Sequence, residues 1–307
     1  MITHDLIDLL RRELPDMELV ENEPMSRHCS FRIGGPAAAM AVPRSVEELS
    51  RLLALLAGVK IRPLVIGNGT NLLVTDSPLD RIVIRLGEKL SHMELEGEDE
   101  VYSLAGVTLA RLAAFCAENS LTGLEFAHGI PGTLGGAVCM NAGAYGGEMK
   151  DVLKSVEYLD AAGALRQLPA EELNLSYRHS IFSDSDKIVV GCRLKLQKGS
   201  SDKIKEQMRL LAEKRRSSQP LDRPSAGSTF KRPQGGYAAA LIEQAGLKGF
   251  SIGGAQVSEK HSGFVINTGE ASFADVTALM KHIEKTVYNN SGILLEPEVK
   301  IIQATEE

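Results

Sequence analysis

The sequence contains no cysteine or histidine pattern that would hold a metal or a disulfide. Its four cysteines are far apart and form no Cys-x-x-Cys pair, so neither a zinc site nor a disulfide framework is indicated. The seven histidines include no His-Glu-x-x-His spacing. We therefore expect a metal-free protein that works in the cytoplasm.

The chain also lacks long apolar runs and an excess of positive charge. No apolar run approaches the length that spans a bilayer, and residues 1–14 predict a short amphipathic helix rather than a signal peptide. The net charge of −6 argues against a nucleic-acid partner. Local basic spots at residues 214–216, Lys231 and Arg232 can bind an anionic small molecule. We expect small-molecule partners, with no membrane and no nucleic acid.

Two familiar nucleotide-binding loops are missing as well. No Gly-x-x-x-x-Gly-Lys-Ser/Thr occurs, so the loop of nucleotide triphosphatases is not indicated. A β-like run at residues 63–66 opens into Gly67-Asn68-Gly69-Thr70-Asn71, but Leu72 replaces the third glycine of the Rossmann pattern and no helix follows. This layout is typical of a loop whose backbone amides face outward.

The distribution of glycine along the chain is distinctive. Residues 129–147 are rich in glycine around an apolar patch at residues 137–140, and we expect such a run to be a poor helix or strand. Converging backbone amides in such a stretch can bind an anion such as a diphosphate. The alternative is an ordinary tight turn with a helix–sheet contact. Two glycine loops of different type point to one extended ligand that is held twice.

The length of 307 residues allows two or three domains with their own cores. We place the boundaries at 1–90, 91–200 and 201–307. Apolar periodicity and capping residues predict helices at 1–14, 45–57, 109–119, 201–218, 237–245 and from about 273. The caps are a capping box at Ser45–Glu48 and single caps at Thr108 and Ser272. Alternating apolar runs predict strands at 40–42, 62–66, 72–74, 81–86, 92–96, 101–105, 154–160, 164–168, 187–196, 263–267 and 293–302.

Seven motifs, taken in order, resemble the UDP-N-acetylenolpyruvoylglucosamine reductase family of bacterial cell-wall synthesis. They lie at residues 30–35, 67–71, 129–147, 177–182, 225–231, 261–264 and 295–299. The resemblance implies an α+β chain with the vanillyl-alcohol-oxidase/PCMH-like FAD-binding fold. In that fold two α+β subdomains hold the flavin and a C-terminal α+β domain binds the substrate. Because the strand at 187–196 follows Phe182 almost directly, the chain resembles the shorter branch of the family.

The resemblance also implies the cofactors and the reaction. FAD is bound non-covalently, and NADPH reduces it before the enolpyruvyl ether of UDP-N-acetylglucosamine is reduced to the lactyl ether, UDP-N-acetylmuramate. Since no pyridine-dinucleotide fold is present, we expect NADPH and substrate to use one pocket in turn. The residues implied in FAD binding are Gly67, Asn68, Gly69, Thr70, Asn71, Gly129, Ile130, Pro131, Gly132, Thr133, Gly135, Gly136, Asn141 and Gly143.

Three residues are implied in catalysis, each with an ordinary alternative. Arg178 suits the substrate carboxylate because its guanidinium is planar and stays charged; the alternative is a salt bridge. Glu298 lies in an apolar terminal segment, where burial would keep it protonated as a hydrogen-bond donor; the alternative is that it pairs with a buried arginine such as Arg178. Ser228 is implied as the proton donor, although such a serine is more often a turn residue or a helix cap.

Four further residues are implied in substrate binding: Tyr177, Arg215, Lys231 and Lys300. The three cations among them could equally be solvated. Ser218 and Arg232 depart from the family pattern in the expected diphosphate-sugar region. Two rival functions stay open on the sequence, an FAD-dependent oxidase or dehydrogenase of the same fold and a non-catalytic nucleotide-binding module.

Overall fold

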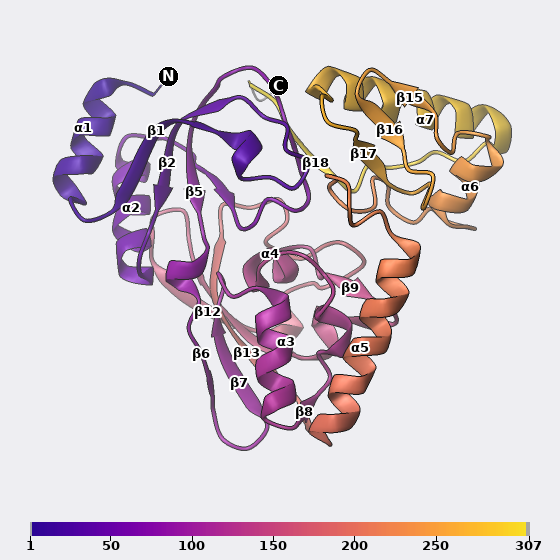
Figure 1. Cartoon of the computed structure of the whole chain (residues 1–307). Helices are drawn as coiled ribbons and strands as arrows, with labels where there is room; N and C mark the ends of the chain where they lie inside the picture. Colours follow the sequence, from indigo (N-terminus) through magenta and orange to yellow (C-terminus); the bar gives the residue numbers. More distant parts are fainter. Residues whose placement is uncertain (1, 305–307) are drawn as a thin grey trace. The chain divides into compact units, whose positions relative to one another are not determined.

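The computed structural model describes residues 2–304 of the chain (Figure 1). The chain divides into two compact units. Unit 1 contains the residues up to Glu21, Ala39–Asn68 and Arg81–Lys214, and unit 2 contains Asn22–Ala38, Gly69–Asp80 and the chain from Arg215 onward. The three domain boundaries expected from the sequence are not tested by this division and stay a prediction.

The first ninety residues form the α/β arrangement that their strand–helix–strand order predicts. The four-stranded sheet has the order β1 (Glu18–Pro24), β2 (Pro36–Val42), β5 (Leu79–Arg85) and β3 (Leu64–Ile66), and β3 runs parallel to β5. Helices α1 (His4–Glu13) and α2 (Val46–Gly58) bury their leucines in a core with Ile82 and Ile84.

The cap of α2 is only half of the predicted capping box. The Ser45 side chain accepts a hydrogen bond from the Glu48 amide, as predicted. The Glu48 carboxylate does not return to Ser45, however, because it accepts from the Arg44 amide at 2.6 Å and also pairs with the Arg44 guanidinium.

The middle of the chain forms a five-stranded antiparallel sheet. Its order is β12 (Leu165–Pro169), β11 (Leu153–Leu159), β13 (Ile188–Lys195), β7 (Glu100–Leu104) and β6 (Met93–Leu95), and β11 and β12 form the predicted hairpin. Helix α3 (Leu109–Glu118) begins after Thr108, whose side chain accepts from the Arg111 amide. Helix α5 (Ser201–Ser218) covers the expected residues and buries Ile204 and Met208. The strand and helix predictions for this region are confirmed.

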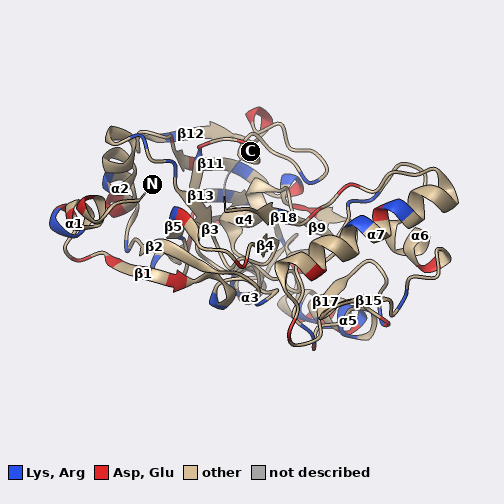
Figure 2. Cartoon of the chain, turned by 90° about the horizontal axis from the view of Figure 1, so that it is seen from above, with Lys and Arg blue, Asp and Glu red and all other residues tan. Residues whose placement is uncertain are grey.

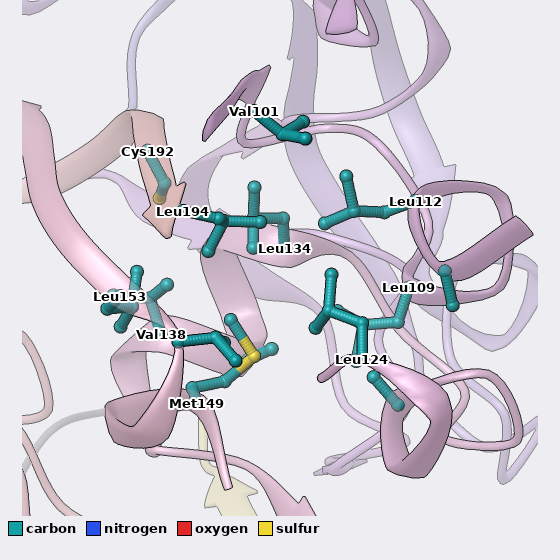
Figure 3. Close-up of a cluster of buried hydrophobic side chains, with 14 of the residues drawn as sticks. Val101, Leu109, Leu112, Leu124, Leu134, Val138, Met149, Leu153, Cys192 and Leu194 are labelled. Atoms are coloured by element: carbon teal, nitrogen blue, oxygen red, sulfur yellow. The ribbon is translucent and has the colours of Figure 1, made fainter. Parts of the chain in front are cut away.

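The glycine-rich stretch contains a helix, which the sequence did not predict. Helix α4 spans Leu134–Cys139 and places Leu134 between Leu194 of β13 and Leu112 of α3 (Figure 3). A Cβ on Gly135 would lie 2.9 Å from the Cβ of Ala105, at the end of β7. Glycine therefore stands in the helix because the backbone packs too closely on the sheet for a side chain.

The C-terminal region builds a three-stranded sheet, β15 (Ser251–Ile252), β16 (Ala255–Val257) and β17 (Val265–Asn267), with helices α6 (Ala238–Gln244) and α7 (Phe273–Ser291). The Ser272 cap of α7 is confirmed, and Asp275 completes a capping box there. Helix α7 packs its apolar stripe against this sheet, in a core that also contains Phe31 and Leu73. The remaining short strands are β8 (Leu121–Thr122) with β14 (Gln197–Lys198), and β9 (Gly143–Ala144) with β10 (Gly147–Glu148).

The predicted last strand is much shorter than expected. Only β18 (Lys300–Ile302) is a strand, and it pairs in parallel with β4 (Leu72–Val74). Pro297 cannot donate to a ladder, and the segment before Lys300 instead forms an isolated antiparallel bridge from Pro297 to Phe230. This irregular segment carries Glu298.

The charges on the surface are mixed. Figure 2 shows basic and acidic positions interspersed along α1 and α7 rather than gathered by sign. Among residues 2–304, no helix has the length and apolar character to cross a bilayer.

Candidate active site

The two glycine-rich loops meet at Gly67 and Thr133, which both belong to unit 1. A Cβ on Gly67 would lie 2.3 Å from Thr133 Oγ1 and 3.2 Å from Thr133 Cγ2. No side chain fits in that space, so glycine is required where the first loop leaves β3. The contact brings together two loops that are more than sixty residues apart in the sequence, as binding of one extended ligand by both loops requires.

The second loop is held against the end of β7 and the start of α3. Thr133 forms an antiparallel bridge with Thr108, and the Leu134 and Gly135 amides donate to the carbonyls of Val107 and Ala105 at 2.8 and 2.9 Å. These two amides are therefore used by the protein. Gly135 packs closely on Ala105, and its predicted role in cofactor binding stays a prediction; Gly136 has only Thr133 Oγ1 near it, 3.7 Å from a Cβ position.

The first loop passes from unit 1 to unit 2 after Asn68. Gly69 has φ +59°, and a Cβ there would lie 2.0 Å from the His28 carbonyl oxygen. The Ser30 amide donates to the Gly69 carbonyl, and the Ser30 hydroxyl donates to the Ser225 carbonyl at 2.6 Å. The 30–35 motif therefore hydrogen-bonds both the first loop and the segment that leads to Ser228.

Asn71 closes the first loop against the segment that carries Glu298. Its side-chain amide donates to the Glu298 carbonyl at 3.0 Å, and its own carbonyl accepts from the Lys300 amide at 2.9 Å. The sequence assigned Asn71 to the cofactor, and the structure adds a direct connection to a predicted catalytic residue.

Asn141 lies in the second loop, buried and in the left-handed region with φ 42°. Its side-chain amide donates to Glu148 Oε2 at 2.6 Å and to the Ser176 carbonyl at 3.0 Å, and its Oδ1 accepts from the Lys150 amide at 2.9 Å. The protein thus occupies both ends of the side chain. The β9–β10 hairpin requires glycine at position 143, since a Cβ there would lie 2.7 Å from the Gly147 carbonyl oxygen.

Arg178 stands at the tip of a tight turn. The Ser176 and His179 backbones exchange two hydrogen bonds around it, and Arg178 has φ 57°, a conformation that is unfavourable for a long side chain. Its guanidinium carbon lies 5.0 Å from the centre of the exposed Tyr177 ring. Ser180 anchors the turn by donating from its hydroxyl to the Cys139 carbonyl, at the end of α4. The Arg178 turn is therefore attached to the second glycine loop.

Ser228 and Glu298 lie in paired segments of unit 2. The Glu298 amide donates to the Thr229 carbonyl at 2.9 Å, and the Lys231 amide donates to the Glu296 carbonyl at 2.8 Å. The buried Thr229 also accepts the Val265 amide on its hydroxyl, at 2.9 Å. Within the described residues, no protein group hydrogen-bonds the hydroxyl of the half-buried Ser228. Ser228 therefore directly precedes a residue whose backbone is fixed by hydrogen bonds, and its hydroxyl has no partner among the described residues.

The predicted substrate residues differ in their surroundings. Lys231 pairs with the carboxylate of the exposed Glu296. Lys300 is exposed at the start of β18, and Arg215 is half-buried in the last turn of α5. Of the two departures from the family pattern, Ser218 ends α5, and Arg232 lies 4.1 Å from the centre of the Tyr237 ring.

Burial keeps two groups beside these segments neutral. Burial lowers the pKa of His261, whose Nδ1 accepts the Gly263 amide at 3.1 Å, and the Gly263 carbonyl in turn accepts the Thr229 amide. Burial also raises the pKa of the Cys29 thiol, which donates to the Ile33 carbonyl. Neither group supplies a charge to the site at neutral pH.

Three residues that organise the site received no role from the sequence: Ser30, Ser180 and Thr229. All three lie inside motifs that the resemblance uses. The signal that could have revealed them is the small hydroxyl side chain in a short motif, since serine and threonine often hydrogen-bond nearby backbone.

Arg178 belongs to unit 1, whereas Ser228 and Glu298 belong to unit 2. That these three residues share one site therefore stays a prediction.

Comparison with known proteins identifies the family. Residues 219–302 match the C-terminal domain of UDP-N-acetylenolpyruvoylglucosamine reductase, and residues 37–168 match an FAD binding domain. The UDP-N-acetylenolpyruvoylglucosamine reductase of Caldanaerobacter subterraneus subsp. tengcongensis is 50% identical over 97% of this chain and 98% of its own length. The chain belongs to the UDP-N-acetylenolpyruvoylglucosamine reductase family. The resemblance recognised in the seven sequence motifs is confirmed.

Solved structures agree with this membership of the reductase family. The crystal structure of the reductase from Thermus caldophilus matches with a TM-score of 0.80 at 36% identity, covering 93% of this chain and 98% of that one. An alkyldihydroxyacetonephosphate synthase matches with a TM-score of 0.50 at 16% identity over 64% of this chain and 41% of its own, which shows a shared fold only. The predicted vanillyl-alcohol-oxidase/PCMH-like FAD-binding fold is confirmed.

The two glycine loops fit FAD on the chemistry of their residues. Neither residues 67–71 nor residues 129–136 include an acidic side chain, so no negative charge opposes a diphosphate. Their meeting at Gly67 and Thr133 leaves backbone, a hydroxyl and small residues where the loops converge. Such a surface suits close approach of an anionic dinucleotide.

Proposed function

We propose that this chain catalyses the FAD-dependent, NADPH-using reduction of UDP-N-acetylglucosamine enolpyruvate to UDP-N-acetylmuramate, a step in peptidoglycan precursor synthesis. The observation that carries this proposal is 50% identity, over nearly the whole of both chains, to a reductase of that name. The contact of the two glycine loops supports it, because that contact provides a place for one dinucleotide.

The groups that would hold FAD are the backbone and small side chains of the two loops around Gly67 and Thr133, since the protein itself binds the side-chain amides of Asn71 and Asn141. Bound there, FAD supplies the hydride for the enolpyruvyl double bond after accepting one from NADPH. Because the sequence contains no Gly-x-Gly-x-x-Gly pattern of a pyridine-dinucleotide fold, we propose that NADPH and the enolpyruvyl substrate use the same site in turn.

Reduction of the double bond requires a proton at the carbon that bears the ether oxygen. When hydride adds to the methylene carbon, negative charge develops on that neighbouring carbon and on its carboxylate. The Ser228 hydroxyl is the proposed proton donor: its backbone is fixed by Thr229, and its oxygen has no hydrogen-bond partner among the described residues. A serine is a weak acid, but the carbon it protonates is strongly basic.

Arg178 and Glu298 are the proposed partners of the developing negative charge. The Arg178 guanidinium can bind both oxygens of the substrate carboxylate. A protonated Glu298 would donate a hydrogen bond to the developing charge, which is worth more in a site that excludes water. Tyr177, Arg215, Lys231 and Lys300 are proposed to bind the substrate. Of these, Lys231 would have to exchange its Glu296 partner for a phosphate.

The class of partner and the cellular location are also proposals. The net charge of −6 supports small anionic ligands rather than nucleic acid. The cell-wall precursor that the enzyme would convert is a water-soluble nucleotide sugar, which supports a cytoplasmic location.

The purified protein tests the function directly. Visible absorption of bound flavin should bleach anaerobically on addition of NADPH and recover on addition of the enolpyruvyl substrate, with stoichiometric formation of the lactyl ether. Colourless protein that gains no absorption with added FAD would exclude the proposal. Rapid oxygen consumption with an alcohol donor, and no response to the enolpyruvyl ether, would favour an oxidase of the same fold.

A further inference from the structure

Each glycine-rich loop contains an asparagine whose side-chain amide donates to a backbone carbonyl of a catalytic segment. Asn71 in the first loop donates to the Glu298 carbonyl at 3.0 Å. Asn141 in the second loop donates to the Ser176 carbonyl at 3.0 Å, at the base of the Arg178 turn. Both were expected from the sequence to bind FAD.

Asn71 holds the backbone of Glu298 by a hydrogen bond to its carbonyl. The Glu298 amide donates to the Thr229 carbonyl, so the peptide is held on one side by the Ser228 segment. On the other side, regular pairing of β18 with β4 begins only at Lys300, and the Glu298 carbonyl accepts the Asn71 side chain instead. The Asn71 amide thus extends the sheet by one bond and sets the position of the Glu298 backbone.

Asn141 uses all of its side-chain hydrogen-bonding groups within the protein, and one of them supports the Arg178 turn. An asparagine offers two donors and one acceptor oxygen. Here the donors serve Ser176 and Glu148, and the oxygen accepts the Lys150 amide. Arg178 has φ 57°, a strained conformation that persists only when its surroundings hold it. The buried Asn141 provides one of those restraints, and Ser180 provides the other through the Cys139 carbonyl.

We propose that Asn71 and Asn141 are positioning residues for Glu298 and Arg178. Each fastens a catalytic segment to the loop that holds the cofactor, so that the loop sets the place of the catalytic side chain. The inference rests on the proposed function, which assigns the chemistry to those two side chains. It differs from a cofactor-binding role because it predicts that loss of either asparagine leaves FAD binding intact.

The test separates the two half-reactions in the holoenzyme. In Asn71→Ala and Asn141→Gly, the FAD dissociation constant and the rate of flavin reduction by NADPH should equal those of the wild type. The rate of flavin reoxidation by the enolpyruvyl substrate should fall roughly tenfold to a hundredfold, since small misplacements of catalytic groups have effects of that size. Glycine is chosen at position 141 because it tolerates φ 42°.

A matched control is Asn119→Ala. Asn119 donates from its side-chain amide to the Phe115 carbonyl at 2.8 Å, at the end of α3, so the variant loses the same kind of bond away from both loops. It should leave both half-reactions unchanged. If Asn141→Gly does not fold, Asn141→Ser provides the same comparison.

The outcomes distinguish the claims. Weakened FAD binding in either variant, parallel to its loss of activity, would overturn the positioning roles and restore the cofactor-binding ones. Unchanged reoxidation in both variants would overturn them as well. A wild-type protein that the enolpyruvyl substrate fails to reoxidise would instead refute the proposed function.

Discussion

Substitution of Gly67 by alanine tests whether the two glycine loops form one binding surface. The new Cβ would lie 2.3 Å from Thr133 Oγ1, and Thr133 Cγ2 lies 3.2 Å away on the same side. Of the staggered χ1 rotamers of Thr133, only the one that turns its Cβ hydrogen toward Gly67 relieves the contact, and β-branched side chains are restricted at χ1. Either Thr133 leaves its rotamer or one of the two loops moves.

The expected cost of this overpacking is about 1–3 kcal/mol. If FAD binds both loops, the cost appears mainly in its affinity, and the FAD dissociation constant should rise roughly fivefold to 150-fold. Fluorescence titration of the apoprotein with FAD measures this directly. Thermal unfolding of the apoprotein reports the part of the cost that affects stability.

A second substitution makes the experiment a double-mutant cycle. Thr133→Ala removes both Oγ1 and Cγ2, which leaves only the Thr133 Cβ, 3.3 Å from the new methyl group. The double variant should therefore bind FAD much more tightly than Gly67→Ala alone, with a coupling energy of about 1 kcal/mol or more. Wild-type FAD affinity in Gly67→Ala, or strictly additive effects of the two changes, would refute a shared surface.

The remaining predictions concern the catalytic residues and the fold of unit 2. Ser228→Ala should keep FAD binding and reduction by NADPH but slow reoxidation by the substrate roughly a hundredfold or more; normal turnover would remove Ser228 as proton donor. Glu298→Gln should slow the same half-reaction by a similar factor, and unchanged steady-state kinetics would exclude Glu298 from the site. Asp275→Ala should lower the unfolding free energy by about 1 kcal/mol at neutral pH, measured by urea unfolding, because it removes half of the capping box of α7. Hydrogen bonds from the Ser272 and Gly254 backbones lower the pKa of Asp275, so its stabilisation should be complete above about pH 4 and lost as the pH falls through its folded value; an equal effect of the substitution at low and neutral pH would contradict this.

Most of the elements of the fold could be predicted from the sequence. Helix α5 lies at the predicted residues because its apolar side chains recur at helical spacing, and α7 begins as predicted because Ser272 caps it. The predictions at α4 and at the last strand were wrong for a common reason. Gly135 lies in a helix that packs too closely on Ala105 for a side chain, and residues before Lys300 leave the strand to pair with the Ser228 segment. Both depend on neighbours that are distant in the sequence.

The site, like the fold, could be predicted only in part from the sequence. The resemblance identified the motifs, but residues within one motif have different tasks. Glycine is required at position 67 because Thr133 leaves no space for a side chain, and at position 135 because the backbone packs on Ala105. The Asn141 side chain hydrogen-bonds three protein partners. Residue type cannot separate these roles, since an asparagine that binds a phosphate and one that binds a carbonyl are the same residue in the sequence.

The amino-acid sequence by itself determined the family, the kind of cofactor and most helices and strands, because these depend on local periodicity, caps and ordered motifs. Only the tertiary structure decided that Gly67 lies against Thr133, that Asn71 holds Glu298 and that Asn141 holds the Arg178 turn. Each of these is a contact between segments that folding brings together. Such contacts depend on shape and on hydrogen-bond partners in space, and these exist only after the chain has folded.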